Sequence, residues 1–509
     1  MKTLICQIKT TAERLDGMSY IIRAADGSVI VVDGSMYDGD PELLLEQLVK
    51  ITGSEKPTVD YWFITHNHMD HTFCFMACAE KYADKITVKK MVYSFFPEEI
   101  YAVMEPACVP ELHRFEAAVD IFGAERVTPV AGDVMELGGT RIEFLYTSAD
   151  CPITNGGKGM TVNDSSLVFR VTAEGQTVLF LGDVEKLGDS VMIERYGASL
   201  KSDVCQVAHH GWNASTIEFY DIVDPDILLW PVDMRFYPTM LHVSRVDRHI
   251  AGEMNVKDIF VAGKGTVWLE MPIKPRKNPD LPKIVPVVEK TGKENVVIPR
   301  ASAAPSLDPS DPLWYQGVPV ELSHSMYEYS AQMYIDTPKG LKLGAGDDRV
   351  SARILWSGNS IYMRVSGKKA TFSDPDHYRS ADSDSLRLYL CEDVVMDPWT
   401  YWSEKADDPA WVDNVKFYYE PKNIGGEKRF TTCPGRSEAV GFCREDGFDI
   451  CLRFDLARPH ESGDLISLNL EFNGVREKGQ NRNYCLSYSS MEVPPCFSNP
   501  YSLVTAMLG

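Results

Sequence analysis

Four side chains that commonly bind metal lie within six residues of one another, at His66, His68, Asp70 and His71. They follow a short apolar run, residues 61–64, that is typical of a buried strand. Imidazole nitrogens and carboxylate oxygens are the ligands that zinc and similar divalent cations prefer. The alternation of ligands with non-ligands, closed by an adjacent Asp-His pair, suits two neighbouring metals better than one. A solvated His-rich loop is the alternative, although short tracts of this kind usually bind metal.

The string HNHMDH at residues 66–71 resembles the HxHxDH signature of the metallo-β-lactamase superfamily. On that resemblance, His66 and His68 would bind one metal, and Asp70 and His71 would bind a second. The resemblance implies an α+β fold, the αββα sandwich of that superfamily. It also implies two divalent metal ions, zinc with manganese as the alternative, and hydrolysis by a hydroxide that bridges them.

The elements that must position this string are readable on its N-terminal side. Strands are predicted over residues 3–9, 19–24 and 28–33, with a hairpin turn between the last two. Residues 41–51 have helical periodicity with proline in the first turn. The order β-β-β-α-β is that of half an αββα sandwich. Asp33 ends the third strand, and it either buttresses the metal loop, as the resemblance implies, or is a turn residue.

Three further candidate ligands lie downstream, each after a predicted strand. Residues 177–181 form an apolar strand that leads to Asp183, which resembles the bridging carboxylate of the family, although it could be an ordinary strand-end residue. Residues 203–208 deliver His209 and His210, and the phrase VAHHGWNAST resembles a family landmark in which one His completes the second metal. The sequence leaves open which of the two binds, with a slight preference for His209.

One family landmark is missing, because the sequence contains no His from residue 114 to residue 208. The phrase NDSSLVF at residues 163–169 resembles the subgroup that contains the hydrolase domain of the competence protein ComEC and the phosphorylcholine esterases. There an Asn/Asp-rich loop stands in place of the missing His. Asp164, with Asn163 as second choice, could therefore supply an oxygen to the first metal. A turn that opens the next strand explains the same residues equally well.

Catalytic roles follow from the same resemblance. Asp70 would orient the attacking hydroxide as well as bind metal. The leaving group needs an acid, and either His242 or the non-ligating member of the 209/210 pair, with His210 as the candidate, could provide it. Arg235 or Arg245 could meet a negatively charged group of the substrate. For His242 and both arginines, a purely structural role is the alternative.

The resemblance to this subgroup implies hydrolysis of a phosphodiester or a related phosphoester. A phosphate bridges two metals well, and the first metal would have fewer imidazole ligands than in β-lactam hydrolases. Hydrolysis of a carboxylic ester, lactone or β-lactam is an alternative. From another class, the chain could mainly bind a glycan or a partner and carry a vestigial hydrolase domain. The predicted substrate is a small-molecule or glycan-linked anion.

Length and composition predict more than one domain, since 509 residues exceed one ordinary core. A net charge of −22 opposes binding to long nucleic acid. The sequence has no apolar run of about 18 residues, so no membrane span is expected. Without a secretory signal at residues 1–17, the 12 scattered Cys are expected to be free thiols and the protein to be cytoplasmic.

Three regions are predicted: a hydrolase domain over residues 1–271, a Pro-rich linker over 272–320 and a β-sandwich over 321–509. Phrases of the last region, such as SARILWSGNSIYMRVSG and GFDICLRFDL, resemble family 9 carbohydrate-binding modules. Such modules hold sugars between aromatic planes. A cluster of aromatic residues could do so here or could belong to the core: Trp399, Tyr401, Trp402 and Trp411.

Overall fold

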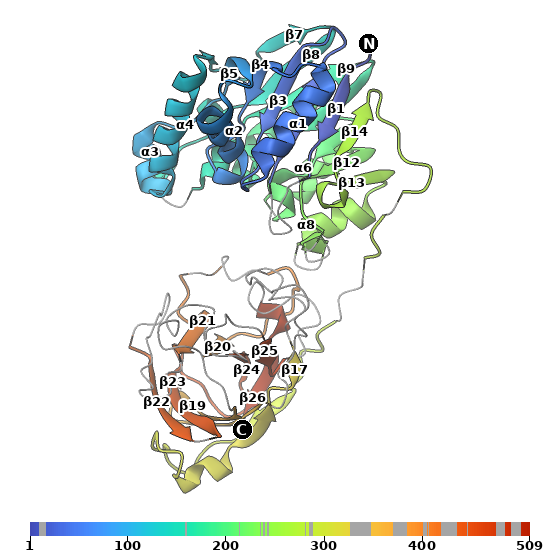
Figure 1. Cartoon of the computed structure of the whole chain (residues 1–509). Coiled ribbons are helices and arrows are strands. Elements are labelled where there is room, and N and C mark those ends of the chain that lie inside the picture. Colours follow the sequence, from blue (N-terminus) through green and yellow to red (C-terminus); the bar gives the residue numbers. More distant parts are fainter. Residues whose placement is uncertain are drawn as a thin grey trace. The chain divides into compact units, whose positions relative to one another are not determined.

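The structure is a computed structural model, and it divides into two compact units, residues 1–284 and 285–509 (Figure 1). Each unit is described by itself. The residues that the structure describes are 1–9, 17–157, 160–212, 214–234, 236–237, 240–241, 244–279, 281–284, 289–325, 348–369, 384–400, 405, 407–418, 435–444, 446–474, 484–489 and 500–509. Within these ranges, none of the helices combines the length and the apolar character that crossing a bilayer requires.

The first unit is built on two sheets that face each other. In order of pairing, one sheet contains β14 (Val267–Glu270), β1 (Leu4–Gln7), β2 (Ser19–Arg23), β3 (Val29–Asp33), β4 (Thr58–Phe63), β5 (Thr87–Val92) and β6 (Glu125–Val127). The other contains β13 (Asp258–Val261), β12 (Ile227–Trp230), β11 (Val204–Gln206), β10 (Gln176–Phe180), β9 (Val168–Ala173), β8 (Thr140–Tyr146) and β7 (Val134–Leu137). Side chains from both sheets, Phe63, Phe169 and Phe180 among them, form the core between them.

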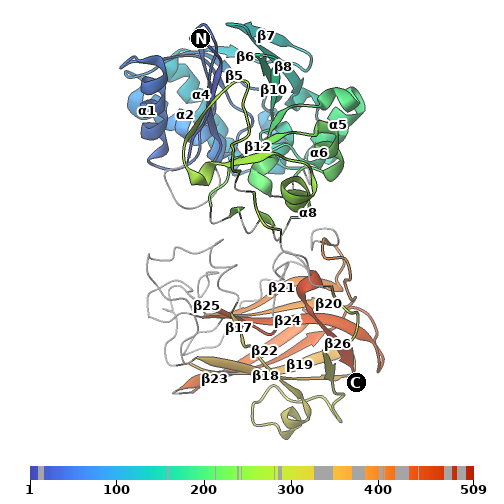
Figure 2. The same cartoon turned by 90° about the vertical axis from the view of Figure 1, so that its right-hand side faces the viewer.

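Helices cover the outer faces of this pair of sheets. Figure 2 shows α1 (Asp40–Thr52), α2 (Met69–Tyr82) and α4 (Cys108–Phe122) on one side, and α5 (Lys186–Tyr196) and α6 (Ile217–Val223) on the other. The apolar residues of α2 and α4, such as Phe75 and Phe115, pack with Trp62 of β4 in a second core. The predicted αββα sandwich is therefore confirmed.

The parallel strands of both sheets place the candidate ligands at one edge. β3, β4 and β5 pair in parallel in one sheet, and β10 through β13 do so in the other. Parallel strands end at the same edge of a sheet, and loops at such an edge commonly form binding sites. The candidate ligands follow β4, β10 and β11 directly, so the fold brings together residues that are far apart in sequence.

The second unit is an all-β sandwich, as predicted. One sheet contains β15 (Val296–Ile298), β26 (Val504–Leu508), β24 (Leu465–Gly474), β20 (Ser385–Cys391) and β21 (Trp411–Tyr418), with β17 (His324–Ser325) and β25 (Tyr484–Ser487) paired beside this path. The other contains β16 (Val318–Glu321), β18 (Arg349–Ser357), β19 (Ser360–Lys368), β23 (Gly447–Asp455) and β22 (Ser437–Arg444). Buried side chains that include Trp356, Phe448 and Phe472 fill the space between them.

The Pro-rich stretch at residues 272–320 is more structured than an extended linker. Its short strands β15 and β16 pair with β26 and β18, at the ends of the strand orders of the two sheets of the sandwich. Ile298 of β15 is fully buried in the core of the sandwich. Prolines are compatible with edge strands because one side of such a strand needs no backbone donor.

The structure describes two of the aromatic residues that we considered for sugar binding, Trp399 and Trp411. Trp411 is buried, and its indole nitrogen donates a hydrogen bond to Asp393. It packs with Tyr389 and Tyr501 in a small core, which is the architectural alternative. Trp399 is half-buried, whereas residues 401 and 402 lie outside the described residues.

Candidate metal centre

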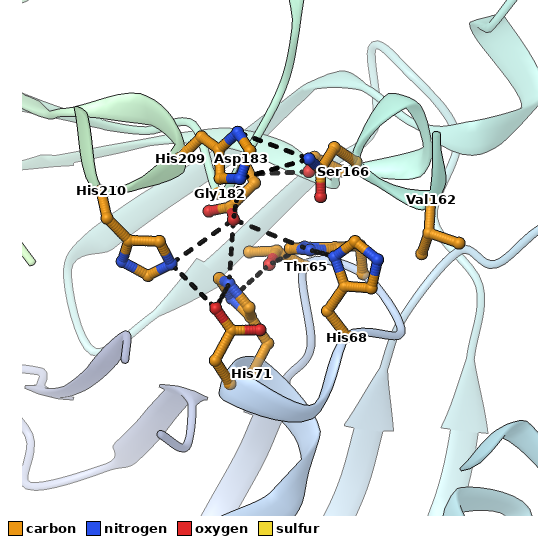
Figure 3. Close-up of polar contacts among 12 residues, drawn as sticks. Thr65, His68, His71, Val162, Ser166, Gly182, Asp183, His209 and His210 are labelled. Atoms are coloured by element: carbon orange, nitrogen blue, oxygen red, sulfur yellow. Dashed lines mark hydrogen bonds and ion pairs between the residues drawn. The ribbon is translucent and has the colours of Figure 1, made fainter. Parts of the chain in front are cut away.

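The His-rich string forms the turn between β4 and α2 (Figure 3). His66 is fully buried, and its Nε2 lies 3.0 Å from Nδ1 of His68. His68 precedes the first residue of α2 and has an extended backbone, so Asp70 and His71 lie in the first turn of the helix. One pair of ligand groups, His66 and His68, therefore precedes α2, and the other pair, Asp70 and His71, lies in its first turn.

Four groups come together next to this turn: Asp70, His71, Asp183 and His210. One ligand atom from each lies within 4.8 Å of the others. Nε2 of His210 lies 3.1 Å from Asp70 Oδ2 and 3.4 Å from Asp183 Oδ2. Nε2 of His71 lies 3.2 Å from the same Asp183 oxygen. Nε2 of His66 approaches that oxygen to 3.9 Å, so Asp183 Oδ2 faces rings from both sides of the string.

A strained turn presents the 209/210 pair. His209 and His210 have φ angles of 47° and 54°, in the left-handed region that residues with a side chain rarely adopt. Nδ1 of His210 lies 2.7 Å from the carbonyl oxygen of Pro231, which leaves Nε2 for the cluster. His210, and not the slightly preferred His209, therefore belongs to the group of four.

Asp33 supports the string from the end of β3. Its Oδ1 accepts a hydrogen bond from the Thr65 amide at 2.7 Å, and its Oδ2 accepts one from the Thr65 hydroxyl at 2.8 Å. Oδ2 also lies 2.7 Å from Nδ1 of His71. Asp33 has a φ angle of 53°, so it makes the turn and buttresses the loop at once.

The chemistry of the group fits a divalent cation. Nε2 of His71 and Oδ1 of Asp183 are buried and make no hydrogen bond in the part of the chain that the structure describes. Burial disfavours a charged His71 ring, yet Asp183, Asp70 and Asp33 together raise the pKa of His71 to about 10. Concentrated buried carboxylates of this kind are satisfied by a positive charge. Nitrogen and carboxylate donors are those that zinc prefers.

In the loop that stands in place of the missing imidazole, Asn163 faces the site, whereas Asp164, our first choice as a ligand, does not. Asp164 caps its own short 3₁₀ turn, because its Oδ2 accepts from the Thr161 amide at 3.1 Å. This is the turn role that we had left open. Asn163 faces the site instead: its Nδ2 lies 3.4 Å from Nδ1 of His209 and donates to Glu185 Oε1 at 2.9 Å.

The remaining candidates do not belong to the group of four or lie outside the described residues. His209 stands next to the group of four, with Nε2 3.9 Å from Asp183 Oδ2. His242 and Arg235 lie outside the described residues, so their predicted roles stay predictions. Arg245 begins α8 (Arg245–Arg248) with an exposed side chain.

Three residues near the site were not predicted from the sequence. Glu105 Oε2 lies 3.0 Å from Nε2 of His68, and Cys108 completes a second group with metal-binding side chains. Glu185 lies next to Asn163, and burial raises the pKa of its carboxyl group. Glu105 joins α3 (Glu98–Met104) to α4 in a stretch that reads as an irregular loop, so no pattern of spacing marks it.

A family model described as the metallo-beta-lactamase superfamily matches residues 12–228. Competence protein ComA of Neisseria gonorrhoeae is 35% identical over 89 residues, which are 17% of this chain and only 12% of that protein. This chain therefore aligns with a small part of that relative.

Solved structures resemble each unit at low sequence identity. The metallo-beta-lactamase fold protein YhfI of Bacillus subtilis is 12% identical, with a TM-score of 0.33, over 52% of this chain and 99% of its own. A family 9 carbohydrate-binding module of Caldicellulosiruptor kristjanssonii is 11% identical, with a TM-score of 0.30, over 42% of this chain and 92% of its own. The match at residues 12–228 identifies the first unit as a domain of the metallo-β-lactamase superfamily.

Proposed function

We propose that residues 1–271 form a phosphodiesterase that uses two divalent metal ions. The observation that carries this proposal is the position of Asp183 Oδ2. Rings from both halves of the His-rich string approach this one oxygen, with His66 Nε2 at 3.9 Å and His71 Nε2 at 3.2 Å. A carboxylate oxygen shared between two cations lowers their mutual repulsion and is typical of two-metal hydrolases.

The proposed ligands fall into two sets that share Asp183. The first set is His66 Nε2, His68 Nδ1 and Asp183, and it contains no third imidazole. The second set is Asp70, His71, His210 and Asp183, the group whose ligand atoms lie within 4.8 Å of one another. When bound, zinc or manganese ions would lower the pKa of a water held between them and polarise the phosphoester.

The side chains of the chain have separate tasks in this proposal. Asp70 Oδ2 lies 3.1 Å from His210 Nε2, where it can orient the attacking water as well as bind metal. His66 and His71 are fully buried, which keeps bulk water from the floor of the site. His209 faces the cluster without belonging to it, and it is placed to protonate the oxygen that leaves.

Charge balance favours a phosphodiester over a neutral ester. Asp70 and Asp183 neutralise half of the charge of two divalent cations. A hydroxide and a singly charged phosphodiester would together neutralise the rest, which leaves a buried site without excess charge. The phrases at residues 163–169 and 207–216, which resemble the ComEC and phosphorylcholine esterase subgroup, support the same substrate class.

The test combines metal analysis with a panel of chromogenic substrates. We expect about two equivalents of zinc or manganese per chain, and turnover of bis-(p-nitrophenyl) phosphate ahead of p-nitrophenyl esters and nitrocefin. Asp183→Ala should lose metal and turnover. Asp226→Ala should retain both, because Asp226 is exposed and directly precedes β12. Preferred turnover of nitrocefin or a carboxylic ester would replace the proposed substrate class. If the chain binds a glycan equally well after chelation and hydrolyses none of these substrates, the proposed enzymatic function is wrong.

A further inference from the structure

A carboxylate that belongs to neither ligand set touches His68 from outside the cluster. Glu105 lies between α3 and α4, and its Oε2 is 3.0 Å from Nε2 of His68. Its other oxygen, Oε1, accepts a hydrogen bond from the Val162 amide at 2.9 Å. Figure 3 shows His68 and Val162 on the same side of the site, away from His210.

We propose that Glu105 is a positioning residue, which holds Nδ1 of His68 toward the first metal and ties this ligand to the loop that replaces the missing imidazole. The inference rests on the proposed two-metal site. Nδ1 of His68 already lies 3.0 Å from Nε2 of His66. A carboxylate that accepts the proton of Nε2 fixes the tautomer and orientation of a metal-binding ring and raises its basicity.

The same arrangement recurs at each of the other proposed imidazole ligands. On the far side of the ring, Nδ1 of His66 lies 3.1 Å from the Thr65 hydroxyl. Nδ1 of His71 lies 2.7 Å from Asp33, and Nδ1 of His210 lies 2.7 Å from the Pro231 carbonyl oxygen. His68 differs in that its far nitrogen is Nε2, which is the atom that Glu105 meets.

Glu105 itself is held in place by the chain around it. Asn67, within the His-rich string, donates a hydrogen bond from Nδ2 to the Cys108 carbonyl oxygen at 3.2 Å. The Cys108 thiol donates to Glu105 Oε2 at 3.8 Å. These contacts fasten the start of α4, on the C-terminal side of Glu105, to the string and to the carboxylate, so Glu105 does not need to be ordered by metal.

The two oxygens of Glu105 accept hydrogen bonds from two different partners, which requires both a carboxylate and a side chain of this length. One accepts from a ring nitrogen and the other from a backbone amide. A glutamine offers one acceptor and would turn its NH₂ group toward one of the two donors. An aspartate keeps both acceptors but is shorter by one methylene. The first metal has few imidazoles, so its affinity should depend strongly on this support.

The experiment compares Glu105→Gln and Glu105→Asp with Glu111→Gln in the full chain. Glu111 is a matched control. Its carboxylate interacts electrostatically with His68 and Asp70, whereas the carboxylate that is hydrogen-bonded to His68 in the described structure is that of Glu105. Stepwise cobalt titration should show the first site weakened about 10- to 100-fold in both Glu105 variants, with the second site nearly unchanged. Glu111→Gln should bind as the parent does.

A second readout needs neither metal nor turnover. In metal-free protein, the proton on Nε2 of His68 should give a ¹H–¹⁵N signal that its hydrogen bond shifts downfield in the parent and in Glu111→Gln, and Glu105→Gln should lose this shift. An unchanged signal, or equal weakening of both metal sites, would overturn the proposal. So would loss of a whole metal equivalent in Cys108→Ser, because His68, Glu105 and Cys108 would then hold a cation of their own. If no phosphodiester is hydrolysed but both Glu105 effects appear, the proposed function fails and the positioning role stands.

Discussion

His71 Nδ1 and Asp33 Oδ2 lie 2.7 Å apart, and both side chains are fully buried. Asp33 ends β3, whereas His71 lies in the first turn of α2, so this contact joins two elements that parallel pairing of β3 and β4 brings together. The contact leaves Nε2 of His71 facing Asp183. The orientation of a proposed ligand is therefore set before any metal binds.

Replacing Asp33 should weaken metal binding in the group of four. In Asp33→Asn, one of the two oxygens that serve Thr65 and His71 becomes an NH₂ group, which cannot accept. We expect metal affinity to fall about 10- to 100-fold, measured by competition with a chelating dye. Asp60→Asn is the control, because Asp60 also accepts a backbone amide but lies toward the start of β4. Equal effects of both variants would mean that general destabilisation is responsible.

Adjacent residues His209 and His210 should give opposite phenotypes. His210→Ala should lose metal, because it removes one of four clustered groups. His209→Gln should keep metal but slow substrates whose leaving group needs a proton. For an alkyl phosphodiester, kcat should fall about 10²-fold or more. For bis-(p-nitrophenyl) phosphate, whose leaving group is stable as an anion, kcat should change little.

The comparison between the two phosphodiesters is the internal control of this prediction. Both are measured on the same metal-loaded His209→Gln preparation, so differences in folding or loading cancel. If kcat falls by the same factor for both substrates, His209 does not act as the acid.

Much of this site could be predicted because its residues adjoin strands. His66 and His68, Asp183 and His210 each follow an apolar run, and parallel strands carry such residues to one edge. The αββα fold was predicted from the order of the N-terminal elements and from the resemblance of residues 66–71 to the superfamily signature. The sequence could not decide between His209 and His210, because both residues lie in a left-handed turn and their order does not show which ring points toward the metals.

Other parts of the site depend on contacts that no local pattern encodes. Glu105 reaches His68 only because the junction of α3 and α4 packs on the string. Asp164 was a plausible ligand because it lies in an Asn/Asp-rich loop, yet its carboxylate accepts a hydrogen bond from the nearby backbone amide of Thr161. Short polar side chains often make such bonds to nearby backbone, and they compete with any distant role.

Protonation of Asp189 should make stability depend on pH. Asp189 is fully buried beneath Ser215 and Thr216, which donate hydrogen bonds to it. Burial raises the pKa of Asp189 to about 7, against the effect of these bonds. Because the folded pKa lies above the unfolded value of about 3.9, this contribution to stability is complete below about pH 4 and is lost as pH rises toward 7.

Urea unfolding of the metal-free protein between pH 4.5 and 7.5 measures this effect. Asp189→Asn cannot lose a proton, so its free energy of unfolding should fall less steeply with pH. The difference in slope should approach about 1.4 kcal/mol per pH unit within this range. Parallel curves for parent and variant would show that Asp189 has the same pKa in both states.

A buried carboxylate should likewise control the stability of the second unit. Glu392 follows β20 and is almost fully buried. It accepts from the backbone amides of residues 457 and 458 at 2.6 and 2.9 Å, and from Arg436 Nη2 at 3.1 Å. Nε2 of His460 lies 3.0 Å from it. Removing one partner of a buried charge network typically costs about 3–5 kcal/mol, so Glu392→Ala should destabilise this unit by that order.

Pulsed thiol labelling separates the two units in the full chain. Cys451 is buried in the second unit and Cys205 in the first, so each thiol becomes reactive when its own unit opens. In Glu392→Ala, Cys451 should react at lower urea concentration, while Cys205 should react as in the parent. Glu438→Ala is the control, because Glu438 is exposed and lies 3.8 Å from Arg453 on the same sandwich. Earlier labelling of both thiols would show that the units unfold together and that the network stabilises the whole chain.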